Sequence, residues 1–153
     1  MSNITAARLQ KLSAIKFESL PLDYAIKTVR GNGKRKVAVF SDPDCPYCKR
    51  LEKDLAKVTD VTIYTFLYPI ASLHPDAARK SKLIWCAPNR QKAWDDYMLR
   101  GELAPEKSCD TPLDEIQAVG QKHKMNGTPT LVFADGRVDG GRRRGFGKLR
   151  PRP

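Results

Sequence analysis

The chain has 153 residues, 41% of them hydrophobic, and its 28 Lys and Arg against 17 Asp and Glu give a formal net charge of +11. The length predicts one domain, and the apolar content excludes a disordered chain. No apolar run approaches the roughly 18 residues of a membrane-spanning helix. The first ten residues, MSNITAARLQ, lack the apolar core of a secretory signal.

Much of the positive charge lies at the C-terminus. Residues 142–153, RRRGFGKLRPRP, hold six bases and no acid. Without them the chain has 22 bases against 17 acids, a net charge of +5. We therefore expect a basic, disordered tail at 142–153, and the competing interpretation is an electrostatic docking site. Only Phe146 interrupts the bases as an aromatic residue, so we expect no nucleic-acid partner.

The expected elements follow from hydrophobic periodicity and turn residues. A short helix is expected over 5–15. Strands are expected at Tyr24–Arg30, Arg35–Ser41, Val61–Tyr68, Thr130–Phe133 and 137–138, and helices at Pro46–Val58, Pro75–Trp85, Gln91–Leu99 and Leu113–Lys124. Gly31-Asn32-Gly33 predicts a hairpin between the first two strands, and Asp135-Gly136 predicts a second hairpin.

This order predicts an α/β fold with a central mixed sheet. The helix Pro46–Val58 joins two strands that we expect to be parallel. We expect residues 24–141 to form the domain, with a helical insertion at about 75–124.

Cys45-Pro46-Tyr47-Cys48 is the motif that carries chemistry, because it stands between a predicted strand and a predicted helix. At a helix N-terminus, unpaired backbone N–H groups and the helix dipole favour a thiolate at Cys45. Cys48 lies one turn further on, where it can form a disulfide with Cys45. The motif predicts thiol–disulfide exchange, in which Cys45 attacks and Cys48 resolves the mixed disulfide. We expect no cofactor beyond this redox pair.

Other interpretations of this motif compete with redox chemistry. A CxxC can be half of a zinc site, but Cys86 and Cys109 are far apart in sequence, and His74 and His123 stand alone. We therefore expect no metal. A purely structural disulfide within one helical turn would close too short a loop to stabilise much.

Thr128-Pro129 follows Gly127 and precedes a predicted strand. A cis proline there would turn the backbone sharply and would suit a redox site. An ordinary turn proline is the alternative.

Cys86 and Cys109 are 23 positions apart. Four cysteines allow three connectivities, and pairing Cys86 with Cys109 keeps the CxxC pair local. Such a disulfide requires an oxidising compartment such as the periplasm, whereas two buried free thiols would suit a cytosolic protein.

The chain resembles the catalytic thioredoxin-fold domain of the DsbC/DsbG family of periplasmic disulfide isomerases. The resemblance is carried by Val37–Cys48, Ile84–Ala87, Ala93–Asp96, Ala104-Pro105, Ser108–Asp110 and Asn126–Thr130. The Cys86/Cys109 pair favours the DsbC branch, whereas the dipeptide Pro46-Tyr47 is familiar from DsbG.

The resemblance implies roles for individual residues. Cys45 would be the exposed nucleophile and Cys48 the buried resolving cysteine. Thr128 and a cis Pro129 would hold extended substrate backbone, and the apolar surface around Tyr47 would accept misfolded chains. Cys86 and Cys109 would form a structural disulfide.

The resemblance also implies a setting for the protein. Family members work in the periplasm, are kept reduced by a membrane reductase of the DsbD type, and form homodimers through an N-terminal domain. The chain departs from this pattern at both ends. Residues 1–23 resemble only the end of the linker helix, so we expect a fragment or a monomeric variant, and 142–153 replace the family's closing helix.

Two functions are therefore considered. The first is thiol–disulfide exchange on secreted proteins, as a disulfide isomerase or reductase. The alternative is a redox-inert, chaperone-like module that binds peptides.

Overall fold

The computed structural model describes residues 14–140. Most of the helix expected over 5–15, and the whole basic tail at 142–153, lie outside the described residues. The strands are β1 (Ile26–Arg30), β2 (Arg35–Ser41), β3 (Val61–Leu67), β4 (Thr130–Phe133) and β5 (Val138–Asp139). The helices are α2 (Pro46–Leu55), α3 (Ala77–Cys86), α4 (Arg90–Arg100) and α5 (Leu113–Lys122), and 3-10 turns lie at Phe17–Ser19 and Leu22–Tyr24.

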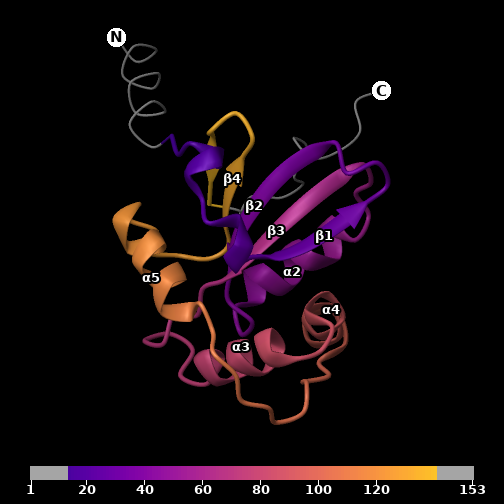
Figure 1. Cartoon of the computed structure of the whole chain (residues 1–153), viewed down its shortest axis with the longest axis vertical. Helices are drawn as coiled ribbons and strands as arrows, with labels where there is room; N and C mark the ends of the chain where they lie inside the picture. Colours follow the sequence, from indigo (N-terminus) through magenta and orange to yellow (C-terminus); the bar gives the residue numbers. More distant parts are fainter. Residues whose placement is uncertain (1–13, 141–153) are drawn as a thin grey trace.

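The strands form one mixed sheet in the order β1-β3-β2-β4-β5 (Figure 1). β2 and β3 are parallel and are joined by α2, which confirms the expected crossover. β1 is antiparallel to β3, β4 is antiparallel to β2, and β4 and β5 form the expected second hairpin. The expected α/β fold with a central mixed sheet is therefore confirmed.

The hairpin expected between the first two strands is wrong, because β1 and β2 each pair with β3, which lies between them. The turn still reverses the chain, with Gly31 and Gly33 at φ +59° and +64°. It folds over the start of β3, where Asp60 accepts the Asn32 N–H at its Oδ1 (3.0 Å) and the Arg35 N–H at its carbonyl (3.2 Å). A local turn signal marks a reversal but does not specify the pairing partner.

The sheet is buried on both faces, as a sheet with a parallel crossover requires. Because side chains alternate along a strand, β2 points Val37 and Val39 to one face and Ala38 and Phe40 to the other. The first face packs against α2 through Val37, Val39, Leu51, Leu55, Val58, Val61, Ile63, Leu131 and Phe133. The second face packs against α5 and the N-terminal 3-10 segment, with Phe40 and Phe66 stacked at 4.6 Å.

The helices α3 and α4 lie together at the end of the sheet where β2 and β3 finish, and α5 lies to one side (Figure 1). Their apolar residues, including Ile84, Trp94 and Met98, form a core with Cys45 and Cys48. The helical pair therefore covers the segment that carries the CxxC motif.

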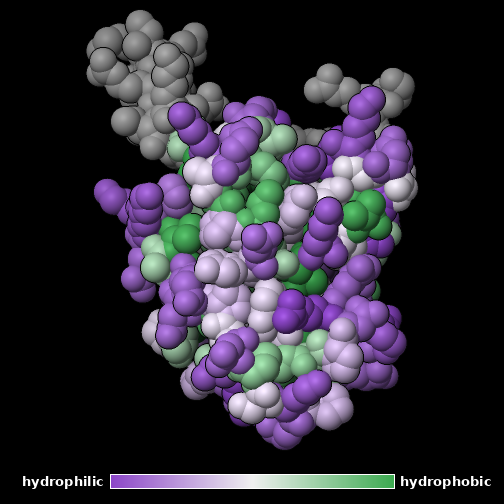
Figure 2. Space-filling view, viewed as in Figure 1, coloured by the Kyte–Doolittle hydropathy of each residue, from purple (hydrophilic) through white to green (hydrophobic). Residues whose placement is uncertain are grey.

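The molecular face shown in Figure 2 is mostly hydrophilic, and its apolar residues lie in small groups between polar ones. Large apolar side chains that are exposed among the described residues are Tyr24, Val29, Tyr47 and Leu73. No helix in residues 14–140 is long and apolar enough to cross a membrane.

Candidate active site

Cys45 lies at the N-cap of α2, with extended backbone dihedrals, and Pro46 occupies the first helical turn. Proline suits this position because the first helical N–H groups have no partner inside the helix. The Cys45 N–H donates to the Asp42 carbonyl (3.2 Å), and the Cys45 carbonyl accepts the Lys49 N–H (3.1 Å). β2 therefore leads directly into a tight turn that delivers the first cysteine to the helix N-terminus.

Both cysteines of the motif are free thiols, and both are buried: Cys45 is 4% exposed and Cys48 is 0% exposed. The expectation of an exposed nucleophile is thus wrong for this conformation, because the loop before β4 covers Cys45. Its Sγ lies 3.5 Å from the Thr128 carbonyl oxygen. The Cys48 Sγ accepts the backbone N–H of Asp42 at 3.4 Å.

The pKa values of the two thiols are shifted in opposite directions. The pKa of Cys45 is lowered from 9.0 to about 5, mainly because the Cys48 thiol donates to its sulfur, with further help from Thr128 and the amides of Tyr47 and Cys48. The pKa of Cys48 is raised, because burial disfavours its thiolate and because its thiol donates a hydrogen bond to the Cys45 sulfur. One sulfur is therefore suited to attack and the other stays protonated beneath it.

The Thr128–Pro129 bond is cis, and the segment before it is tied to the fold by two side chains. The Tyr68 hydroxyl donates to the Met125 carbonyl (2.7 Å), and the Thr130 hydroxyl donates to the Gly127 carbonyl (2.8 Å). These contacts hold the Thr128 carbonyl beside Cys45. Tyr47 lies between the two cysteines in sequence and is 43% exposed.

Asp42 anchors the approach to the motif, a role that the sequence reasoning missed. Its carboxylate is fully buried and accepts the N–H groups of Asp44 (2.8 Å) and Ile70 (2.9 Å). Its Oδ2 also lies 2.8 Å from the Nδ1 of His74, so this histidine does not stand alone. The sequence around Asp42 gives no sign of this histidine, which is 32 residues away.

A second buried carboxylate, Glu52, lies one helical turn after Cys48 in α2 and was also missed. Its Oε1 accepts the indole N–H of Trp94 (2.7 Å), and its Oε2 has no hydrogen-bond partner among the described residues. Burial raises the pKa of Glu52 to about 7, against the opposing effect of the Trp94 hydrogen bond.

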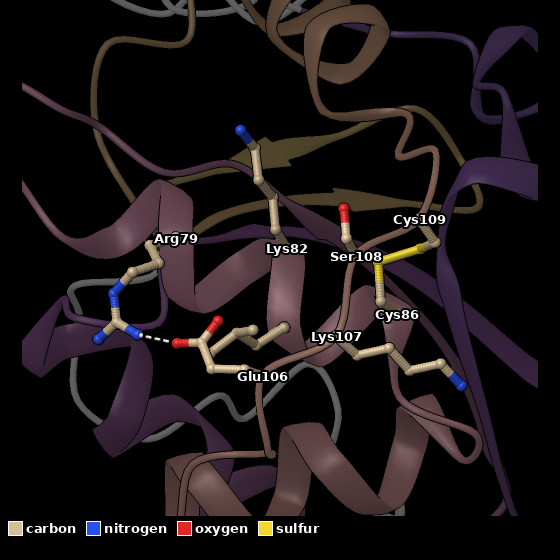
Figure 3. Close-up of a pocket in the computed structure, with 8 residues that line it drawn as sticks. Arg79, Lys82, Cys86, Glu106, Lys107, Ser108 and Cys109 are labelled. Carbon is tan, nitrogen blue, oxygen red and sulfur yellow. Dashed lines mark hydrogen bonds and ion pairs between the residues drawn. A yellow bond between two sulfur atoms is a disulfide. The ribbon is translucent and has the colours of Figure 1, made fainter.

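Cys86 and Cys109 form a disulfide with a Cα–Cα distance of 5.7 Å. It joins the end of α3 to the loop before α5 and borders a pocket of about 390 Å³ (Figure 3). An ion pair between Arg79 and Glu106 crosses this pocket at 3.0 Å. The Cys86–Cys109 disulfide thus joins a long loop to α3, the helix that packs behind the CxxC motif.

The remaining polar groups offer no metal site: within residues 14–140, no three His, Cys, Asp or Glu side chains are grouped closely enough to hold a metal ion. The groups described above act on the sulfur atoms of Cys45 and Cys48 by shifting their pKa values.

Comparisons with known proteins agree with this geometry. The family model of the thioredoxin-like domain matches residues 22–146. A solved disulfide interchange protein from Neisseria gonorrhoeae is 55% identical, covers 85% of this chain and 93% of its own, and superposes with a TM-score of 0.80. The catalytic domain of ScsC from Proteus mirabilis, at 20% identity and a TM-score of 0.62, shares the fold.

Curated relatives are similar over part of their length. A probable thiol:disulfide interchange protein DsbC from Bordetella pertussis is 47% identical over 139 residues, which are 90% of this chain and 49% of that protein. The thiol:disulfide interchange protein DsbC of Escherichia coli is 34% identical over 105 residues, 67% of this chain and 44% of that protein. The chain thus spans about half the length of these relatives. It belongs to the thioredoxin-like domain family, in its DsbC-like branch.

Proposed function

We propose that this chain catalyses thiol–disulfide exchange on secreted proteins, as a disulfide isomerase and reductase. The observation that carries the proposal is the pair Cys45 and Cys48 at the start of α2, with pKa values shifted in opposite directions. Attack needs a thiolate, and Cys45 supplies one at neutral pH. The chain needs no cofactor besides its own cysteine pair.

In reduction, the Cys45 thiolate attacks one sulfur of a substrate disulfide. A Cys45–substrate disulfide forms, the substrate S–S bond breaks, and the other substrate sulfur leaves as a thiolate that takes up a proton. Cys48 then loses its proton and attacks the Cys45 sulfur, which forms the Cys45–Cys48 disulfide and releases the second substrate thiol. Two electrons pass from the cysteine pair to the substrate.

In isomerisation, a different substrate thiolate attacks the mixed disulfide before Cys48 does. This forms a new substrate disulfide and returns the Cys45 thiolate, so there is no net oxidation or reduction. The high pKa of buried Cys48 favours this route, because a protonated sulfur resolves the intermediate slowly.

We assign substrate binding to Thr128, Pro129 and Tyr47. The Thr128 carbonyl lies 3.5 Å from the Cys45 sulfur, so a chain joined to Cys45 would pass along this segment and could pair with its backbone. Tyr47 offers an exposed aromatic surface beside the reacting sulfur. Entry of the substrate must displace the cover over Cys45, since that residue is only 4% exposed.

The setting that we propose follows from the DsbC-named relatives. The substrates are misfolded or mispaired disulfide-containing proteins of the periplasm, and a membrane reductase of the DsbD type regenerates the dithiol. The Cys86–Cys109 disulfide supports an oxidising compartment. The full-length form is proposed to be a homodimer joined by a further domain, since the relatives are about twice as long.

The decisive test compares wild type, Cys45→Ser and Cys48→Ser in reduction of insulin and in refolding of a scrambled disulfide substrate. Cys45→Ser should abolish both activities, whereas Cys48→Ser should accumulate a covalent Cys45–substrate species that is visible by mass spectrometry. Suppression of aggregation measures the alternative, a redox-inert peptide-binding module. A wild-type chain that neither reduces insulin nor refolds the scrambled substrate, but still suppresses aggregation, would establish that alternative instead.

A further inference from the structure

The residue before the attacking cysteine carries a charge. The carboxylate of Asp44 is only 15% exposed, and its Oδ1 accepts hydrogen bonds from the Lys80 ammonium and the Tyr97 hydroxyl, both at 2.7 Å. Its own N–H is fixed by Asp42 at 2.8 Å. Asp44 is therefore held at both its backbone and its side chain, directly beside Cys45.

The partners of Asp44 come from the two helices of the insertion, Lys80 from α3 and Tyr97 from α4. The Tyr97 ring also has two ammonium groups near it, those of Lys49 at 5.1 Å and Lys80 at 5.4 Å from its centroid. Three helices thus meet at one carboxylate. The charged and titratable side chains around Asp44 are Lys49, Lys80, Tyr97 and Asp42, whose Oδ1 accepts the Asp44 N–H.

Asp44 is ionised at neutral pH. Burial acts to raise its pKa, but the hydrogen bonds from Lys80 and Tyr97 and the charges of Lys80 and Lys49 together hold the pKa below its usual range. A bare carboxylate in this place would oppose the formation of a second negative charge on the neighbouring sulfur. The helix N-terminus of α2 would then have to stabilise two anions.

We propose that Lys80 is a positioning residue for the redox pair: it holds and neutralises the Asp44 carboxylate, so that this charge does not oppose the Cys45 thiolate. The proposal rests on the function proposed for Cys45. It assigns to the helical insertion a direct electrostatic effect on the attacking sulfur. Lys80 touches neither sulfur, and it acts through Asp44.

The test measures the pH dependence of alkylation by iodoacetamide on the Cys45 peptide of the full chain. Lys80→Met should raise the pKa of Cys45, so that the thiolate fraction below that pKa falls on the order of threefold. Lys82→Met is the matched control, with the same charge change on the same helix and no contact to Asp44, and should leave the pKa unchanged. Lys80→Arg should retain the wild-type value.

The double variant separates the electrostatic effect from a structural one. Lys80→Met combined with Asp44→Asn should return the pKa of Cys45 to the wild-type value or below it, because the opposing charge is gone. Asp44→Asn alone should lower that pKa, and this nearly isosteric change keeps the test available if Lys80→Met fails to fold.

Three results would overturn the inference. The first is an equal Cys45 pKa in Lys80→Met and Lys82→Met, and the second is a raised pKa that persists in the double variant. The third is an Asp44→Asn variant with a raised pKa. If the wild-type pKa of Cys45 is lowered and any of these results is found, only the role of Lys80 is refuted, and the proposed function stands. An ordinary wild-type thiol pKa without insulin reduction would overturn the proposed function as well.

Discussion

Replacement of Glu52 by Gln tests whether a buried acid makes the stability of this domain depend on pH. Glu52 is 8% exposed, its Oε1 accepts the Trp94 indole N–H, and its Oε2 has no hydrogen-bond partner among the described residues. Glutamine keeps an oxygen for Trp94 and removes the ionisable group. The substitution therefore alters charge while preserving the shape of the side chain.

The magnitude follows from the pKa of Glu52, which burial raises from 4.5 to about 7. Each pKa unit corresponds to about 1.4 kcal/mol, so the shift is worth about 3 kcal/mol. Because the pKa of Glu52 is raised in the folded state, its contribution to the free energy of unfolding is fully present below pH 4.5, where Glu52 is protonated in both the folded and the unfolded state. It declines as the pH rises, and it is lost above about pH 7, where folding must bury a carboxylate.

Urea unfolding of wild type and Glu52→Gln across pH 4.5 to 8.5 measures the difference in their free energies of unfolding. This difference should move by about 3 kcal/mol in favour of the variant as the pH rises. Exposed Glu18 supplies the matched control, since Glu18→Gln makes the same chemical change outside the core. A Glu52→Gln difference that is the same at both ends of the range would refute the reasoning.

Three further predictions address the disulfide, a helix contact and the thiol. Replacing Cys86 and Cys109 by Ala should lower the free energy of unfolding by about 3 kcal/mol in chemical denaturation, because the bond closes a loop of 23 residues. Gly120→Ala should destabilise by about 1–3 kcal/mol in the same assay, although alanine favours helices, because its Cβ would lie 2.2 Å from the Tyr68 ring. Alkylation of Cys45 should be half-maximal near pH 5, and a midpoint near 9 would contradict the lowered pKa.

The fold was predictable where local signals decide it. The apolar run in Arg35–Ser41, the apolar face of the helix after Pro46 and the Asp135-Gly136 turn each specify one element, and these elements appear as expected. The pairing of β1 was not predictable, because a turn at Gly31–Gly33 suits a hairpin and a split pair equally. β3 enters between the two strands only through contacts that the local sequence does not encode.

The candidate active site was likewise predictable only where its residues are close together in the sequence. Cys45 and Cys48 are three residues apart, so strand, helix and motif could be combined from sequence. The groups that tune them lie far along the chain: Lys80 is 36 residues from Asp44, Tyr97 is 53 residues from it, and Trp94 is 42 residues from Glu52. Nothing in the local sequence marks Lys80, Tyr97 or Trp94 as partners of these acids, and only the packing of the insertion gives them this role.

The helix α4 relates these separate contacts to one another. Trp94 and Tyr97 are three residues apart, so they lie on the same face of the helix. Tyr97 donates to the carboxylate just before Cys45, and Trp94 donates to the carboxylate one turn after Cys48. One face of the insertion therefore donates hydrogen bonds on both sides of the redox pair, and both bonds end on acids whose charge bears on the first turns of α2. Substitutions on this face of α4 should therefore shift the pKa values of Cys45 and Cys48, although the substituted side chains contact neither sulfur.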